Sequence, residues 1–488
     1  MLFTAQHHSA DRSFELVRRS LLQDQDLPFA DALTTSQIEQ AFEAEGILFG
    51  VTPQNPDDAS GNSPTIVYTM GVTLWAMLSQ ALFTDVQRAC RAAVQRVAVY
   101  YALLGMKISS TNTGAYCRAR AKVPEGVLKR LAVSLADRCE ESVPDEWRWN
   151  GFRVLVVDGS TFSMPDTEEN QAEYPQTVSQ EEGLGFPMMR GVGLTSLATG
   201  MVIALALGPY AGKETGETAL FRSLFDQLKT GDLVLSDRYY GGWFMRALLQ
   251  ELGVEFVTRL HQFRTADFHQ GKSLGKDDHV VTWPKPQRPK WLDQETYDRL
   301  PDHLEVREIK VNVDQPGFRT ESLVVVTSLR DHRRYKRDVI AEIYRRRWIV
   351  ELELRDIKST MKLDVLRRTT PEWVRQELWT GLLAYNLIRQ SMLQSALGGE
   401  CQPSELSFAA SLQMLSNAWV LAGVPPLVSI SAREQLIALR ILNGQTHRVG
   451  NRPDRVEPRA VKRRPNPIAL LAKSRKSARG KLTSGIKT

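Results

Sequence analysis

The segment FRVLVVDG, residues 152–159, is a near-continuous run of apolar residues, most of them branched. Such a run is typical of a strand buried on both faces of a sheet. Two more strand-like runs follow within 190–208, and helical and strand-like segments then alternate along the chain as far as residue 260. The order strand, strand, strand, helix, strand, helix, strand predicts an α/β fold, with a mixed sheet flanked by helices.

The regions before and after this alternating segment have sequence patterns of their own. Residues 1–145 carry helical periodicity and several exposed-type arginines, which are equally compatible with a DNA-binding module and with an ordinary charged helix surface. After the strand VEFVTRL, the pattern breaks into short β-like pieces rich in Pro, Trp and Lys, and a buried-type strand, SLVVVTSL, then returns. We therefore expect a sheet domain split into 146–260 and 323–400, with a β-rich insertion at 261–322.

The C-terminal end differs in composition from the rest of the chain. Residues 401–446 are predicted to be helical, whereas 447–488 contain 13 Lys or Arg and two acids. The excess of basic over acidic residues in this tail is larger than the net charge of +6 of the whole chain, so all of the basic excess lies in the tail. Like-charge repulsion and proline oppose folding there, so we expect a disordered tail that neutralises phosphates, or simply a solubilising end.

Composition excludes several classes of protein. The hydrophobic fraction of 42% and charged fraction of 24% in 488 residues are ordinary for a globular protein of two or three domains. The cysteines Cys90, Cys117, Cys139 and Cys401 form no CxxC pair, which argues against a disulfide framework and for a reducing compartment. No apolar run approaches the roughly 18–20 residues that span a bilayer. We expect a soluble, intracellular protein without a membrane partner.

Two carboxylates follow apolar strand segments. We expect Asp158 at the C-terminal end of the first buried strand and Asp237 at the end of DLVLSD, residues 232–237. A carboxylate at such a position costs several kcal/mol to desolvate unless something compensates it. For either residue alone, hydrogen bonds to the following loop are a sufficient explanation.

A third carboxylate lies in IYRRRWIVELELRDIKSTM, residues 343–361. At about 100° per residue, Tyr344, Arg347, Glu351 and Lys358 line one narrow polar stripe of a helix. Beside it runs an apolar stripe suited to docking on the sheet, formed by Ile343, Val350, Leu354, Ile357 and Met361. The simpler alternative is that Arg347 and Glu351 only form an i,i+4 ion pair, worth a few tenths of a kcal/mol.

Three carboxylates at one end of a sheet repel one another unless a divalent cation neutralises them. Oxygen ligands with open positions suit Mg²⁺ or Mn²⁺. The sequence thus predicts a metal site at Asp158, Asp237 and Glu351. GPYAGKET, residues 208–215, has too short a glycine spacing for a phosphate-binding loop, so no nucleotide cofactor is expected.

This combination resembles the ribonuclease H-like fold of DDE transposases. The helix matches the signature Y-(2)-R-(3)-E-(6)-K, which is similar to bacterial transposases of the insertion sequence 4 family. DGSTFSMPDT and DRYYGGWF, which contain the first and second Asp, resemble the corresponding surroundings in that family. The long interval between Asp237 and Glu351 also resembles that family, which houses a β-rich insertion there.

The resemblance implies a cut-and-paste DNA transposase that cleaves element ends and joins the 3′-OH to target DNA. It implies two metal ions held by the three acids, DNA as the partner, a homodimer in the synaptic complex, and a cytoplasmic, nucleoid-associated location in a bacterium. The residues expected to contact DNA are Tyr344, Arg347, Lys358, Arg238, Trp283, Lys462, Arg463 and Arg464. The alternatives are a ribonuclease H-like nuclease or resolvase, and a non-catalytic DNA-binding regulator or decayed copy.

Overall fold

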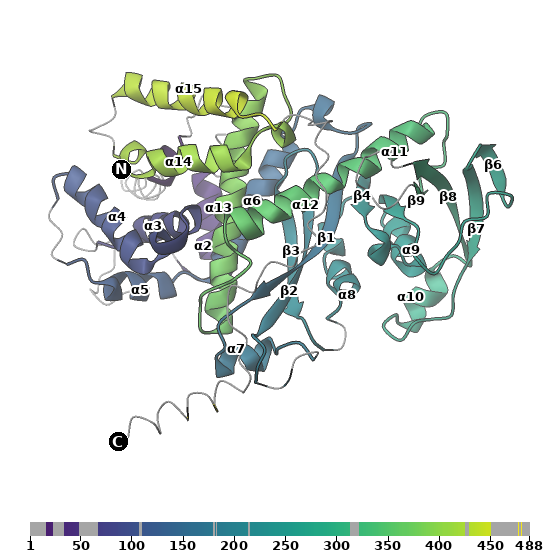
Figure 1. Cartoon of the computed structure of the whole chain (residues 1–488), viewed down its shortest axis with the longest axis horizontal. Helices are drawn as coiled ribbons and strands as arrows, with labels where there is room; N and C mark the ends of the chain where they lie inside the picture. The colour runs from purple at the N-terminus through teal and green to yellow at the C-terminus, as the bar shows by residue number, and fades with distance from the viewer. Residues whose placement is uncertain are drawn as a thin grey trace, which may run out of the picture.

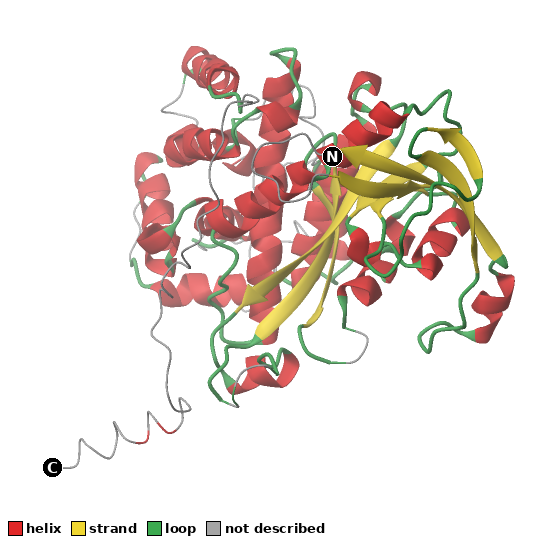
Figure 2. Cartoon of the chain, turned by 45° about the vertical axis from the view of Figure 1, so that its right-hand side comes forward, coloured by secondary structure: helices red, strands yellow, loops and turns green. Residues whose placement is uncertain are grey.

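The structure is a computed structural model of the whole chain. The structure describes residues 16–22, 34–47, 67–106, 110–178, 181, 183–212, 215–312, 322–424, 429–449, 477 and 480. The three basic residues expected to bind DNA in the tail, 462–464, and nearly all of that tail lie outside the described residues. Figure 1 shows a helical part beside a sheet that extends away from it, and Figure 2 shows the same division by secondary structure.

Within these ranges the strands form one nine-stranded mixed sheet in the order β3-β2-β1-β4-β5-β9-β8-β7-β6. β1 pairs antiparallel with β2 and parallel with β4, and β4 pairs parallel with β5. The strands are β1 (Arg153–Ser163), β2 (Met188–Ser196), β3 (Val202–Pro209), β4 (Asp232–Ser236), β5 (Glu255–Arg259), β6 (Lys272–Gly275), β7 (Asp278–Pro284), β8 (His303–Asn312) and β9 (Ser322–Thr327). The α/β mixed sheet that the sequence predicts is confirmed.

The β-rich segment after β5 is continuous with this sheet. β9 pairs antiparallel with β5 on one side and with β8 on the other, and β7 and β6 continue outward. The short strands expected at 261–322 are therefore present, but they lengthen the sheet and do not close into a sheet of their own. The domain boundaries given above remain predictions.

The helices fall into three groups along the chain. Those before the sheet are α2 (Thr35–Glu43), α3 (Met70–Leu82), α4 (Cys90–Leu103), α5 (Thr113–Ala121) and α6 (Glu125–Glu141), with the short 3-10 helix η1 (Asp85–Arg88). Those between strands are α7 (Glu168–Glu173), α8 (Glu217–Arg222), α9 (Trp243–Glu251), α10 (Gln294–Arg299) and the 3-10 helix η4 (Arg238–Tyr240). Those after β9 are α11 (Arg337–Arg346), α12 (Trp348–Arg355), the π-helix η5 (Asp356–Thr360), α13 (Pro371–Leu397), α14 (Phe408–Ala422) and α15 (Ile430–Thr446).

The long helix α13 joins the helical part to the sheet. It packs against α3 and α6 from the N-terminal group and against α14 and α15 from the C-terminal group. The buried apolar residues of these helices belong to one core cluster that also includes one side of the sheet. In Figure 1, α13 runs through the middle of the helical part. The N-terminal helices thus share a core with the sheet and with the C-terminal helices.

A second core cluster defines the sheet face that matters for the acids. Alternate residues of β1 and β4, including Val154, Val156 and Leu235, pack there against α11 and α12. Since side chains alternate between the two faces of a strand, Asp158 continues the series of Val154 and Val156 on this face. Figure 1 shows α11 and α12 crossing β1 as one nearly straight diagonal.

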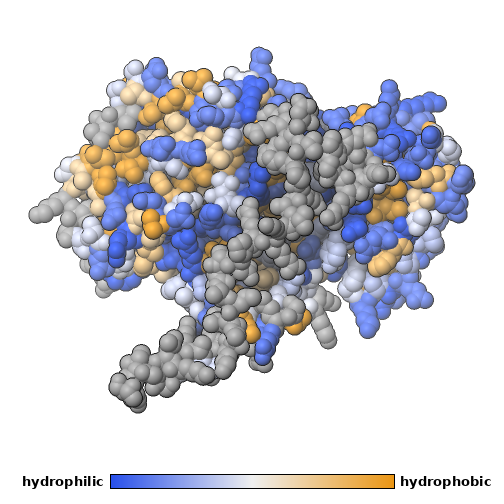
Figure 3. Space-filling model, in the orientation of Figure 1, coloured by the Kyte–Doolittle hydropathy of each residue, from blue (hydrophilic) through white to orange (hydrophobic). Residues whose placement is uncertain are grey.

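The surface contains both polar and apolar areas. Figure 3 shows apolar side chains gathered mainly over the helical part, where α14 and α15 expose Leu421, Ile430, Leu439 and Leu442. Across the described residues, no helix has the length and apolar character needed to cross a membrane.

Candidate active site

Asp158 and Asp237 occupy matched positions on neighbouring parallel strands. The last pair of the register joins Val156 of β1 to Leu235 of β4, and two residues further along come Asp158, still in β1, and Asp237, the first residue after β4. The expectation that Asp158 ends its strand is wrong, because β1 continues to Ser163 by pairing with β2. What ends near Asp158 is β4, and Asp237 immediately follows it. The two acids meet where these strands separate.

The third acid lies on the helix pair that covers this face. The expected apolar stripe is confirmed, since Ile343, Val350, Ile357 and Met361 are buried and Leu354, its fifth member, is half-buried against the same core. The helix itself is not one regular α-helix: α11 ends at Arg346, α12 begins at Trp348, and Lys358 belongs to the π-helix η5. π-Helical turns are frequent at functional sites. Here the irregular turns separate Arg347, Glu351 and Lys358 onto successive segments.

Each acid has a local hydrogen-bond partner through one of its oxygens. Asp158 Oδ1 accepts from the backbone N–H of Gly159 at 2.8 Å. Asp237 Oδ1 accepts from the backbone N–H of Tyr239 at 2.7 Å. Glu351 Oε1 accepts from Arg347 Nη2 at 3.1 Å, and its side chain is 54% exposed. The i,i+4 ion pair that was the simpler explanation of the helix is therefore present.

Electrostatics nevertheless connects all three acids. The pKa of Asp158 is raised to about 6, mainly by burial and also by the nearby charges of Asp237 and Glu351, whereas the Gly159 N–H and Arg347 act to lower it. Like-charge neighbours disfavour ionisation, as in other paired carboxylates. Perturbed carboxyl groups in a cleft are candidates for functional sites. The acids are thus neighbours, and their mutual repulsion is only partly compensated by one arginine.

A divalent cation fits the chemistry of this set but not yet its geometry. All three side chains offer oxygen ligands, and a cation would remove the repulsion that raises the pKa of Asp158. Among the described residues, however, no group of three His, Cys, Asp or Glu side chains is close enough to hold a metal. Glu351 faces Arg347, so closing the ligand set requires its carboxylate to turn away from that guanidinium.

The basic residues of the signature lie close to the acids. The Arg347 side chain is 11% exposed, and its pKa is raised because Tyr344, Glu351, Asp158 and Asp237 outweigh the effect of burial. Lys358 and Asp158 line the same cavity of about 20 Å³ between the sheet and the helix. Arg238 is exposed directly after Asp237. These three cations are positioned around the acids.

Two aromatic residues expected to meet DNA are buried. Tyr344 is 4% exposed, and burial is the main cause that raises its pKa. Trp283 is 5% exposed, and its indole N–H donates to Glu308 Oε1 at 3.0 Å. The guanidinium groups of Arg246 and Arg264 lie over the Trp283 ring at 4.7 and 4.1 Å. In this conformation Trp283 is a buried residue of the outer sheet, and its ring is covered by these two guanidinium groups.

Glu217 and Tyr240 adjoin the acids but were not singled out in the sequence. A Cβ added to Gly159 would lie 2.5 Å from the Glu217 carboxyl carbon, so Glu217 packs against the residue that follows Asp158, on the other face of β1. The Tyr240 hydroxyl donates to Glu217 Oε2 at 3.0 Å. The pKa of Tyr240 is raised by burial and by the charges of Glu217, Asp158 and Asp237, so the phenol remains a hydrogen-bond donor. No local pattern identifies either residue, because both contacts are tertiary.

A buried ion pair anchors the acid-bearing helix from behind. Glu353 lies two residues after Glu351 on α12, and its Oε1 is 3.2 Å from Arg389 Nη2 of α13. Arg389 Nε donates to the Tyr385 hydroxyl, which donates to the carbonyl of Gly200 in the β2–β3 turn. A Cβ on Gly200, which has φ +70°, would meet Glu353 Oε1 at 2.6 Å. The network therefore joins α12 to α13 and to the sheet.

The known proteins to which this chain is similar are transposases. A family model described as a transposase DDE domain matches residues 149–387. Transposase InsG for insertion sequence element IS4, from Escherichia coli (strain K12), is 30% identical over 363 residues, which cover 72% of this chain and 76% of that protein. A cryo-EM structure of a piggyBac transposase synaptic complex with hairpin DNA aligns over 87% of this chain and 84% of that chain, with TM-score 0.40 and 8% identity.

The family match identifies the chain as a transposase of the DDE class. More narrowly, the chain belongs to the insertion sequence 4 family of transposases, and its function is DNA transposition.

Proposed function

We propose that the chain cuts the ends of its element and joins the released 3′-OH to target DNA, with Asp158, Asp237 and Glu351 as the catalytic acids. The observation that carries this proposal is the matched position of Asp158 and Asp237 on parallel strands, under a helix whose Glu351 contributes to the raised pKa of Asp158. The order β3-β2-β1-β4-β5, antiparallel and then parallel, supports a ribonuclease H-like core.

The three acids would hold Mg²⁺, or Mn²⁺, as a pair of ions in each active site. When bound, such ions supply an activated attacking oxygen and stabilise the leaving oxygen in phosphoryl transfer. The residues of the chain then have separate tasks. Arg347 can bind a phosphate bidentately and Lys358 as a point charge, while exposed Arg238 contacts the strand beside Asp237.

Arg347 has a second task in this proposal. Its guanidinium pairs with Glu351, so a DNA phosphate that binds Arg347 competes with that ion pair. Release of Glu351 would bring its carboxylate toward Asp158 and Asp237. DNA binding and completion of the ligand set would thus be coupled through one side chain. Two protomers at a synapse and phosphate contacts by Lys462, Arg463 and Arg464 complete the proposed assembly.

The test is cleavage of a labelled DNA duplex that ends in the terminal inverted repeat flanking the reading frame. Single replacements of Asp158, Asp237 or Glu351 by Ala should abolish Mg²⁺-dependent cleavage and leave binding of the duplex largely intact. Glu305→Ala removes an exposed acid paired with Arg330 and should cleave normally. Cleavage by any of the three acid variants at the wild-type rate would refute the assignment.

A strand-transfer assay with a pre-nicked end separates the alternatives. A transposase joins the exposed 3′-OH to a target plasmid, whereas a nuclease or resolvase on the same fold cuts without joining. A non-catalytic regulator binds the duplex and neither cuts nor joins it.

A further inference from the structure

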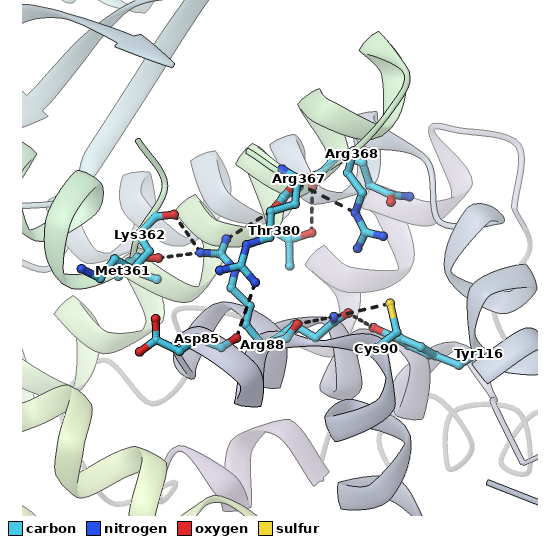
Figure 4. Close-up of polar contacts among 12 residues, drawn as sticks. Asp85, Arg88, Cys90, Tyr116, Met361, Lys362, Arg367, Arg368 and Thr380 are labelled. Carbon is cyan, nitrogen blue, oxygen red and sulfur yellow. Dashed lines mark hydrogen bonds and ion pairs between the residues drawn. The ribbon is translucent and has the colours of Figure 1, made fainter. Parts of the chain in front are cut away.

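A second basic site lies away from the three acids, between the N-terminal helices and the segment that follows the signature helix. It is a cavity of about 210 Å³ whose lining includes Arg88, Arg120, Arg367 and Arg368, together with Glu377 and Cys90. Figure 4 shows Arg88 extending to the backbone of Met361 and Lys362, with Arg367 and Arg368 on an adjacent segment of the chain. Asp158, Asp237 and Glu351 are not part of this lining.

The positive charge of this arginine pocket exceeds what its single lining carboxylate can neutralise. Glu377 Oε1 forms an ion pair with Arg88 Nη2 at 3.4 Å, and Glu377 Oε2 lies 4.0 Å from Arg368 Nε. Its other contact is the backbone N–H of Arg367, at 2.7 Å. The Arg367 guanidinium donates to the carbonyl of Asp85 at 3.5 Å, which is long for a hydrogen bond.

Burial makes this excess of cations unfavourable. Arg88 is 5% and Arg120 8% exposed. The pKa of Arg88 is lowered by burial and by repulsion from Arg367 and Arg368, and Glu377 offsets this only in part. Arg120 Nη1 donates to Cys90 Sγ at 3.1 Å, a weak acceptor unless it is ionised. A bound anion would supply the missing negative charge.

The shape and the donors suit a phosphate group. Guanidinium forks bind phosphate oxygens in pairs, and clusters of arginines are the usual protein device for this ligand. At roughly 30 Å³ per water molecule, a cavity of about 210 Å³ has room for several waters, and hence for one phosphate. Arg88 is already fixed by the carbonyl oxygens of Met361 and Lys362, at 2.8 and 2.9 Å. Arg367 and Arg368 are less constrained and can turn toward a ligand.

Backbone hydrogen bonds connect the arginine pocket to the strand that carries Asp158. The Ser163 N–H, at the end of β1, donates to Asp364, and the Leu366 N–H donates to Ser163. The arginines at 367 and 368 therefore follow directly after a segment attached to the end of the strand that carries Asp158. Ser163 lies five positions after Asp158 on β1, a rise of about 17 Å at 3.3 Å per residue. At 3.4 Å per nucleotide along a duplex strand, the span from Asp158 to this point of attachment corresponds to about five nucleotides.

We propose that the arginine pocket binds a phosphate group, supplied by the DNA backbone about five nucleotides from the phosphate that reacts at the acids. The inference rests on the proposed function, because it assumes that DNA reaches the acid site. It adds a contact that fixes where the DNA strand lies along β1 and at the end of the signature helix. Free phosphate is the other source of the same ligand, and the experiment separates the two.

The first measurement is the salt dependence of binding to a labelled duplex ending in the terminal inverted repeat. Arg367→Gln/Arg368→Gln should weaken binding and lower the slope of log K against log salt by about one for each phosphate that the variant no longer neutralises. Arg130→Gln, which removes an arginine 54% exposed on α6, serves as the control and should change neither quantity. Arg88 is left in place because its hydrogen bonds hold the backbone at Met361. An unchanged affinity and slope in the double variant would overturn the proposal.

The second measurement locates the phosphate and identifies its source. Neutral methylphosphonates placed one at a time along the strand should weaken wild-type binding about five nucleotides from the cleaved bond and have no further effect there in the double variant. Alkylation of Cys90 by iodoacetamide, followed by peptide mass spectrometry, should slow when the duplex is added. If inorganic phosphate slows alkylation but the duplex does not, the pocket takes free phosphate and the DNA assignment is wrong. These readouts do not require cleavage, so they can succeed or fail independently of the catalytic proposal.

Discussion

Replacement of Glu353 should reveal a pH-dependent term in the stability of the fold. Glu353 and Arg389 are each 4% exposed, and Glu353 Oε2 is buried without a hydrogen-bond partner among the described residues. Burial raises the pKa of Glu353 from 4.5 to about 7, although Arg389 lowers it. Between pH 4.5 and about pH 7, the folded state therefore keeps a proton on Glu353 that the unfolded chain has already lost.

The sign and size of the effect follow from linkage. A raised folded-state pKa contributes stability that is fully present below pH 4.5 and is lost as the pH rises through about 7. A shift of about 2.5 units at 1.36 kcal/mol per unit corresponds to about 3 kcal/mol. Glu353→Gln lacks this titration, so its destabilisation relative to wild type should be about 3 kcal/mol smaller at pH 8 than at pH 4.5.

Urea unfolding followed by tryptophan fluorescence at several pH values measures this difference. Glu305→Gln, at an exposed position, is the matched control and should follow wild type at every pH. Arg389→Met leaves the buried carboxyl group without its cation and should cost about 3–5 kcal/mol near neutral pH, with partial recovery in Glu353→Gln/Arg389→Met. If wild type and Glu353→Gln remained parallel across the pH range, the buried carboxyl group would not titrate as described.

Three further substitutions test the surroundings of the acids. Asp158→Asn should abolish cleavage yet raise the thermal unfolding midpoint at pH 8. The reason is that the pKa of about 6 makes the ionised carboxylate cost about 1–2 kcal/mol after discounting for partial exposure, and this gain should disappear near pH 4. Gly159→Ala should lower both stability and cleavage, because its methyl group would displace the Glu217 carboxylate, and Gly159→Ala/Glu217→Ala should recover stability. Tyr240→Phe removes the hydrogen bond to Glu217 and should cost about 1 kcal/mol in urea unfolding, whereas an unchanged midpoint would show that this bond contributes nothing.

Local patterns predicted the parts of the fold that depend on periodicity. The order of strands and helices from β1 to β5 is confirmed because buried strands and amphipathic helices leave runs and stripes in the sequence. The apolar stripe from Ile343 to Met361 is confirmed for the same reason. Pairing partners leave no such mark. The attachment of β9 to both β5 and β8 could not be foreseen, since each run reads equally well as a strand in a separate sheet.

The site was predictable in its residue types and less so in its geometry. The apolar run stops at Val157, and Asp158 was therefore expected to end the strand. Backbone pairing with β2 does not depend on side-chain polarity, and it extends β1 to Ser163. No Gly or Pro in the sequence marks the interruption of the helix at Arg347 or the π-helical turn that contains Lys358. Glu217 reaches the site only through tertiary packing against Gly159.

Diffraction from crystals of the protein with an element-end duplex and Mn²⁺, recorded for anomalous scattering, would test the shared metal site. We expect manganese peaks between the carboxylates of Asp158 and Asp237, with Glu351 turned from Arg347 toward the metal. A structure at saturating Mn²⁺ that lacks such peaks, and in which Glu351 is still paired with Arg347, would contradict the assignment of these three acids.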